Sequence, residues 1–114
     1  LLRRQDRRAD AVKLYKELAS DVRTKEGSAA AYYVLEDVFA GGDMDKAEKA
    51  IFAYSEREPQ AYWLAKAFIL LGDVYVRKGD NFQARATYQS VADGYSPADD
   101  GIVAEAKERI AKLN

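Results

Sequence analysis

The chain has 114 residues, with 18 Lys and Arg against 19 Asp and Glu, two Pro, seven Gly and neither His nor Cys. This length is enough for one domain that forms a core without disulfides or metal. The missing His and Cys exclude thiolate chemistry, imidazole-based nucleophile pairs and structural zinc sites, and the formal charge of -1 gives no overall attraction for nucleic acid or acidic lipid.

Apolar residues recur every three to four positions along most of the chain, which is the spacing of amphipathic helices. No run of β-branched residues with alternating polarity competes with this pattern. The sequence therefore predicts an all-α fold of about six helices. Their apolar stripes, in chain order, are Ala11, Leu14, Tyr15, Leu18 and Val22; Tyr32, Leu35, Val38 and Phe39; Ala47, Ala50, Ile51 and Tyr54; Leu64, Ala67, Phe68, Leu71 and Tyr75; Ala84, Tyr88, Val91 and Tyr95; and Val103, Ala106, Ile110 and Leu113.

Capping residues, proline and glycine mark the ends of these helices. We expect Ser28 to cap the second helix and Asp80 the fifth, because their side-chain oxygens can accept hydrogen bonds from unpaired backbone N–H groups. Pro59 suits the first turn of the fourth helix, and Gly42 and Gly79 suit the positive φ that follows a helix end. Because the connections are short, sequential helices are predicted to pack antiparallel.

The fourth helix carries apolar residues on more than one side, since Ile69, Leu70, Val74 and Val76 flank its main stripe. A helix of this kind is expected to be buried all round, in the middle of the fold. The same apolar stretch is too short to cross a membrane and contains Lys66 and Asp73, so no membrane insertion is expected.

An internal repeat accompanies the helix pattern. The sequence Leu-Glu-Asp-Val-Phe at 35–39 returns 36 positions later as Leu-Gly-Asp-Val-Tyr at 71–75, and a glycine-bearing turn follows each copy. A glycine inside a helix is unfavourable by roughly 1 kcal/mol relative to alanine. We therefore expect Gly72 to permit close approach of the next helix at Ala84.

One repeat unit contains Phe68, Leu71, Gly72, Tyr75, Ala84, Tyr88 and Pro97, and a looser one contains Tyr32, Leu35, Phe39, Ala47, Ile51 and Pro59. This pattern resembles the tetratricopeptide repeat, whose signature combines an aromatic residue, Leu-Gly, Tyr, Ala, a second aromatic residue and a closing Pro. The resemblance implies a right-handed solenoid of antiparallel helix pairs that acts as a protein-interaction scaffold. Residues 1–114 would form one domain, with units at about 1–27 (second half only), 28–60 and 61–97 and a capping helix at 98–114.

In tetratricopeptide arrays, the first helices of successive units line a concave groove that binds a protein or peptide partner. The resemblance implies that two stripes of this chain, distinct from the core stripes, line such a groove. Their mixed apolar and charged residues would hold an extended or helical peptide. The implied groove residues are Ala30, Tyr33, Asp37, Lys66, Ile69, Asp73, Val76 and Arg77.

Adjacent aromatic residues leave a different binding function open. Tyr33 and Tyr62 are expected to be exposed, and clustered aromatic rings can stack on sugars, so a glycan-binding surface is one alternative. The packing interpretation instead gives Tyr32 to the core and places Trp63 over the junction between units.

A third interpretation is a structural spacer or self-assembly segment of a larger envelope protein. The chain starts at Leu1 without Met, so we expect a piece of a longer protein, and the ends of a cut solenoid could pair as a homo-oligomer. The long repeat period and the Tyr-Trp-Leu-Ala sequence at 62–65 are similar to arrays in cell-envelope proteins of Gram-negative bacteria. That resemblance implies a periplasmic or outer-membrane-associated location.

Two groups of charged residues have simpler explanations than a binding site. The basic group at the N-terminus suits the solvated side of a helix, and the acidic group near the last turn fails the alternating pattern of a calcium loop. No phosphate-binding or dinucleotide motif is present, so we expect no catalysis, cofactor, metal or nucleic acid. The two groups are Arg3, Arg4, Arg7 and Arg8, and Asp93, Asp99, Asp100 and Glu105.

Overall fold

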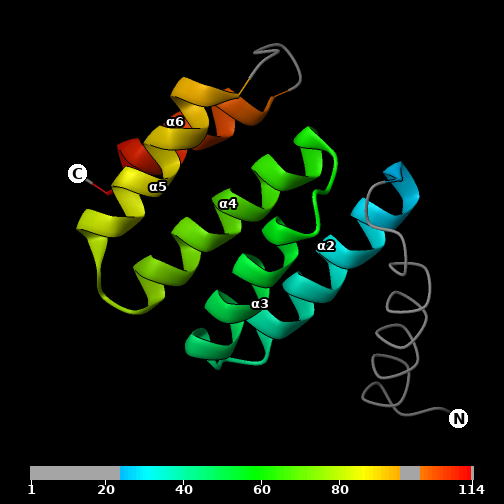
Figure 1. Ribbon diagram of the computed structural model, residues 1–114. Coiled ribbons are helices and arrows are strands. Elements are labelled where there is room, and N and C mark those ends of the chain that lie inside the picture. The colour runs from blue at the N-terminus through cyan, green and yellow to red at the C-terminus, as the bar shows by residue number, and fades with distance from the viewer. Residues whose placement is uncertain (1–23, 96–100, 114) are drawn as a thin grey trace, which may run out of the picture.

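The computed structural model describes residues 24–95 and 101–113. Every regular element in these ranges is an α-helix, so the predicted all-α class is confirmed. The predicted first helix, the N-terminal arginines, Pro97, Asp99 and Asp100 lie outside the described residues. The helices, labelled as in Figure 1, are α2 (Lys25–Ala40), α3 (Met44–Glu56), α4 (Ala61–Arg77), α5 (Asn81–Gly94) and α6 (Ile102–Lys112).

Side-chain caps define where three of the helices begin. The Thr24 hydroxyl accepts a hydrogen bond from the Gly27 backbone N–H at 2.9 Å and caps α2. Asp43 caps α3 in the same way, and Asp80 caps α5 as predicted. The prediction that Ser28 caps the second helix is wrong, because Ser28 lies fully buried inside α2.

Turn residues agree with the predicted helix ends in two places and differ in one. Gly42 lies in the turn after α2, and Gly79 lies in the turn after α4. Their φ angles are +93° and +81°, a region of backbone conformation that costs little only for glycine. Pro59 lies just before α4 rather than in its first turn, because Gln60 is the N-cap residue of that helix.

The central position of α4 is the main feature of the arrangement. Each helix runs back along the one before it, with α2 and α3 on one side of α4 and α5 and α6 on the other (Figure 1). Within the described residues, α4 contacts the other four helices, whereas the backbones of α2 and α3 do not approach those of α5 and α6. This confirms that the fourth helix is the middle of the fold.

One hydrophobic core runs through both sides of α4. Tyr32 and Leu71 belong to it, as their stripes predict, and so does the fully buried Tyr88. Its buried members are Ala30, Ala31, Tyr32, Leu35, Ala47, Ile51, Tyr54, Ala65, Ala67, Ile69, Leu70, Leu71, Val74, Tyr75, Ala84, Tyr88, Val91, Ile102 and Ala106.

Gly72 is the point at which α5 comes very close to α4. A Cβ atom built on Gly72 would lie 2.2 Å from Cε1 of Tyr88, far inside van der Waals contact. The expectation that Gly72 leaves room for α5 is therefore confirmed, but the predicted contact with Ala84 is wrong, because the Tyr88 ring fills this space. Glu36, the equivalent residue of α2, is exposed.

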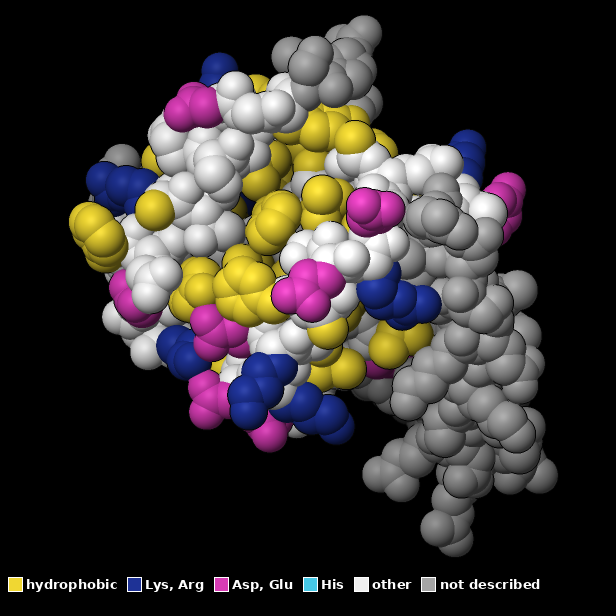
Figure 2. Space-filling view, in the orientation of Figure 1, with side chains coloured by type: hydrophobic (Ala, Val, Ile, Leu, Met, Phe, Trp, Pro, Cys, Tyr) yellow, Lys and Arg dark blue, Asp and Glu magenta, His cyan; other side chains and the backbone are white. Residues whose placement is uncertain are grey.

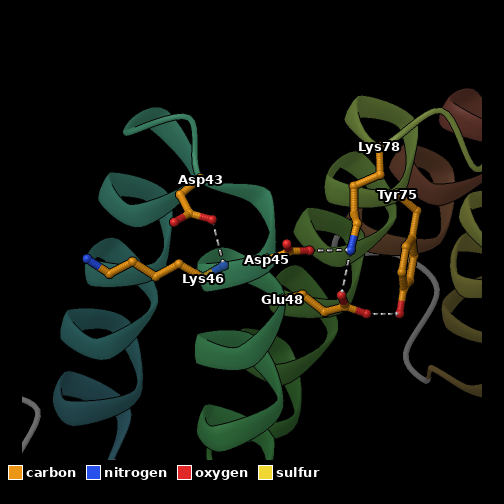
Figure 3. Close-up of polar contacts among 6 residues, drawn as sticks. All are labelled: Asp43, Asp45, Lys46, Glu48, Tyr75 and Lys78. Carbon is orange, nitrogen blue, oxygen red and sulfur yellow. Dashed lines mark hydrogen bonds and ion pairs between the residues drawn. The ribbon is translucent and has the colours of Figure 1, made fainter.

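A polar network joins the start of α3 to the end of α4 (Figure 3). The Lys78 ammonium lies 2.7 Å from Asp45 and 3.0 Å from Glu48, and the Tyr75 hydroxyl donates to Glu48 at 2.8 Å. The hydrogen bonds from Tyr75 and Lys78 hold the pKa of Glu48 below its ordinary value, while burial and the bond to Glu48 raise the pKa of Tyr75 to about 12. The network fixes how α3 packs on α4.

Candidate functional site

The predicted groove residues separate into buried and accessible positions. Ala30 and Ile69 are only 4% and 3% exposed, so these two side chains belong to the core and are not available to a partner. Ile69 is covered because α4 is packed from both sides, and Ala30 is covered because α2 packs on both α3 and α4. Of the remaining residues, Tyr33, Val76 and Arg77 are exposed and Asp37, Lys66 and Asp73 are half-buried.

The accessible residues lie on α2 and α4. α4 contacts both α2 and α6, and we call the surface that these three helices share the α2–α4–α6 face. Across it, the Arg109 Nε donates to an Asp73 carboxylate oxygen at 3.1 Å, and these residues stand 36 positions apart. The same step takes Asp73, Val76 and Arg77 to Arg109, Lys112 and Leu113.

Aromatic side chains fill the α2–α4 part of this face. The Trp63 ring lies 5.5 Å from Tyr32, 5.8 Å from Tyr33 and 5.0 Å from Tyr62, measured between ring centroids. The Lys66 ammonium lies 5.6 Å from the Tyr32 ring and 5.9 Å from the Tyr62 ring, within cation–π range. Trp63 therefore covers the junction between the two helices, as predicted, and Tyr33 and Tyr62 are its exposed neighbours.

A pocket of about 310 Å³ occupies the α4–α6 part of the face. Three of the predicted groove residues, Asp73, Val76 and Arg77, line it, and α2 contributes one aromatic side chain. We call it the α4–α6 pocket. Its lining comprises Phe39, Asp73, Val76, Arg77, Tyr88, Arg109, Lys112 and Leu113.

Asp73 connects three helices at the wall of the pocket. Its carboxylate accepts hydrogen bonds from the Tyr88 hydroxyl of α5 and from Arg109 of α6, and Arg109 also lies 3.4 Å from Glu105. Burial, followed by the bond to Asp73, raises the pKa of Tyr88, so the phenol stays protonated as a donor. The negative charge of Asp73 is thus matched inside the fold.

The other two cations of the pocket lack such a partner in the packed interior. The Arg77 guanidinium lies 5.1 Å from the centre of the Phe39 ring. Lys112 pairs with Glu108 one turn earlier at 3.1 Å, and both side chains are about two-thirds exposed, at 66% and 62%. An exposed pair of this kind contributes little and exchanges readily with solvent or another anion. The pocket therefore combines an unpaired guanidinium and an exposed ammonium with an apolar wall.

A second hollow lies outside the α2–α4–α6 face. Hydrophobic side chains follow the seam between α4 and α5 in Figure 2, and a pocket of about 290 Å³ opens there. Its lining is mostly apolar, with Leu64, Phe68 and Val91 among its members, and it carries no charged residue. The hollow offers little to orient a ligand, because specificity requires placed polar groups.

The sequence prediction does not include the contribution of α6 or of two aromatic rings. Arg109, Lys112 and Leu113 belong to the predicted capping helix, although the 36-residue step from α4 identifies them. The half-buried Phe39 and the buried Tyr88 belong to predicted core stripes, and only the tertiary structure shows that they also border the pocket.

Comparison with protein families, curated proteins and solved structures finds no match. In the described residues, no cluster of acidic side chains is placed to hold a metal ion. No helix within residues 24–95 and 101–113 combines the length and apolar composition that crossing a membrane requires. The function is therefore inferred from the α2–α4–α6 face.

Proposed function

We propose that the chain is a tetratricopeptide-like helical-repeat scaffold that binds a segment of a partner protein on the α2–α4–α6 face. The observation that carries the proposal is the bond between Asp73 and Arg109, which joins equivalent positions of successive units. A repeat protein places equivalent residues side by side in this way because each unit packs on the next with the same geometry.

The pattern of helix contacts supports a stacked arrangement. In the described part of the chain, each helix contacts the next one. In addition, α2 contacts α4, and α4 contacts α6. A closed bundle would bring the first and last helices together, whereas the backbones of α2 and α6 do not approach. Nearest-neighbour contact of this kind is typical of solenoids.

The side chains of the face favour binding over a spacer role. Tyr33 is 41% exposed beside Trp63, and Val76 is 40% exposed beside the α4–α6 pocket. Exposed aromatic and apolar groups among charges are typical of interaction sites. A partner segment would lie on a surface that the fold has already formed, which reduces the entropic cost of binding.

Site-specific photo-crosslinking in the full chain tests the proposal. We expect a photoreactive amino acid at Tyr33 or Val76 to give discrete adducts with a protein in a native lysate. The matched controls are Phe52 and Phe82, which are also exposed but belong to α3 and α5. Adducts of equal yield and identity at the control positions, or none at Tyr33 and Val76, would refute the proposed face and favour a spacer.

A further inference from the structure

We infer that the α4–α6 pocket takes an acidic protein segment, in which an Asp or Glu carboxylate lies next to an apolar side chain. This inference depends on the proposed function and adds the chemistry of the partner. The pocket is the part of the α2–α4–α6 face where both charge and an apolar wall are present in one hollow of about 310 Å³.

Three cations line the pocket, and two of them already pair with carboxylates. Arg109 lies 3.1 Å from Asp73 and 3.4 Å from Glu105, and Lys112 lies 3.1 Å from Glu108. Arg77 is therefore the cation of the lining that has no carboxylate partner among the described residues. An unmatched guanidinium attracts carboxylates and repels basic segments.

Arg77 and Lys112 are the two cations that a ligand can reach. No carboxylate of the described residues pairs with Arg77, whose guanidinium lies over the Phe39 ring instead. The partner of Lys112 is Glu108 of the same helix, in an exposed pair that a bound carboxylate can replace. The planar guanidinium of Arg77 can donate two parallel hydrogen bonds to one carboxylate.

The apolar wall distinguishes a protein segment from a polyanion. Phe39, Val76 and Leu113 line the same hollow as the cations, and Val76 is exposed. A nucleic-acid backbone or a free phosphate would use the charges but leave this wall uncovered, and the chain as a whole carries no positive excess to support such binding. A side chain such as Leu or Phe covers the wall while its acidic neighbour reaches Arg77.

Selection of short random peptides on the full chain tests this inference. We expect the selected peptides to be enriched in Asp or Glu adjacent to an apolar residue. Their affinity should fall by at least about tenfold in Arg77→Glu and in Lys112→Glu, since each change replaces an attraction with a repulsion. Lys107→Glu is the matched control: it makes the same charge change on the exposed surface of α6, away from the pocket, and should alter affinity less than twofold.

The outcomes separate the inference from the proposed function. Peptides that show no acidic enrichment, or that bind Arg77→Glu normally but lose affinity when Tyr33 is changed to Ala, would overturn the acidic pocket and leave the binding face in place. Heparin or inorganic phosphate that competes as strongly as the selected peptides would overturn it in favour of a general anion site. The absence of any selected peptide would overturn both proposals.

Discussion

Adding a single methyl group at Gly72 should destabilise the fold, even though alanine is the better helix former. Gly72→Ala gains roughly 1 kcal/mol of helix propensity. It also places a Cβ atom 2.2 Å from Cε1 and 2.6 Å from Cδ1 of Tyr88. Real Cβ contacts do not reach these distances, so either the ring or the helix must move.

The magnitude depends on how freely the Tyr88 ring can move. Its side chain is 1% exposed and its hydroxyl donates to Asp73, so a displaced ring loses both packing and a hydrogen bond to a charged group. Overpacking costs about 1 to 3 kcal/mol, and a bond to a charged group contributes about 1.5 to 3 kcal/mol. After subtracting the gain in propensity, Gly72→Ala should lower the free energy of unfolding by roughly 1.5 to 5 kcal/mol.

Urea unfolding followed by far-ultraviolet circular dichroism measures this change in free energy. Thermal unfolding should show a fall in Tm on the order of 10 °C or more. A second background provides the control. In Tyr88→Leu the ring is absent, so Gly72→Ala should become neutral or stabilising there by up to about 1 kcal/mol. A Gly72→Ala chain as stable as the original, or an equal loss in both backgrounds, would refute the claim that the ring requires the glycine.

Three further substitutions test individual contacts by the same unfolding measurement. Ser28→Ala removes the buried hydroxyl that accepts a hydrogen bond from the Gln60 backbone N–H at 2.9 Å, and should lower the free energy of unfolding by about 1 to 2 kcal/mol. Its control is Ser90→Ala at an exposed position, which should change the free energy of unfolding by less than about 0.5 kcal/mol. Asp80→Ala removes the cap of α5 and should cost about 1 kcal/mol. Tyr75→Phe removes the donor to Glu48 and should cost about 1 kcal/mol near neutral pH. The pKa of Glu48 is below 4.5 in the folded chain, so this last contribution is complete above pH 4.5 and should disappear as the pH falls through the lowered pKa.

The helices could be predicted because their signals are local. Apolar spacing placed all five described helices, and the glycines at 42 and 79 marked turns whose positive φ only glycine adopts at little cost. The errors at Ser28 and Pro59 have a common physical reason. The Ser28 hydroxyl accepts from the Gln60 backbone N–H, so a residue typical of a helix start serves instead to join α2 to the entry of α4.

The proposed binding face was harder to predict, because it depends on how the helices stack. The tetratricopeptide resemblance selected Tyr33 and Val76, which are exposed, but it also selected Ala30 and Ile69, which neighbouring helices bury. The α6 wall required applying the 36-residue step once more, from Asp73 to Arg109, across a segment whose resemblance to the repeat is weak.

The two helix pairs use different contacts at equivalent positions, and this bears on which part of the face is rigid. In α4 and α5, the buried Tyr88 ring packs directly on Gly72. The equivalent residues of the preceding pair are Glu36, which is exposed, and Ile51, which has no polar tip. That pair is joined instead near its end, where the buried Tyr54 hydroxyl donates to a backbone carbonyl of α2 at 2.8 Å. The α4–α6 pocket is thus built on the pair with the tighter contact, and a preformed pocket binds a carboxylate at a lower entropic cost than one that must first be ordered.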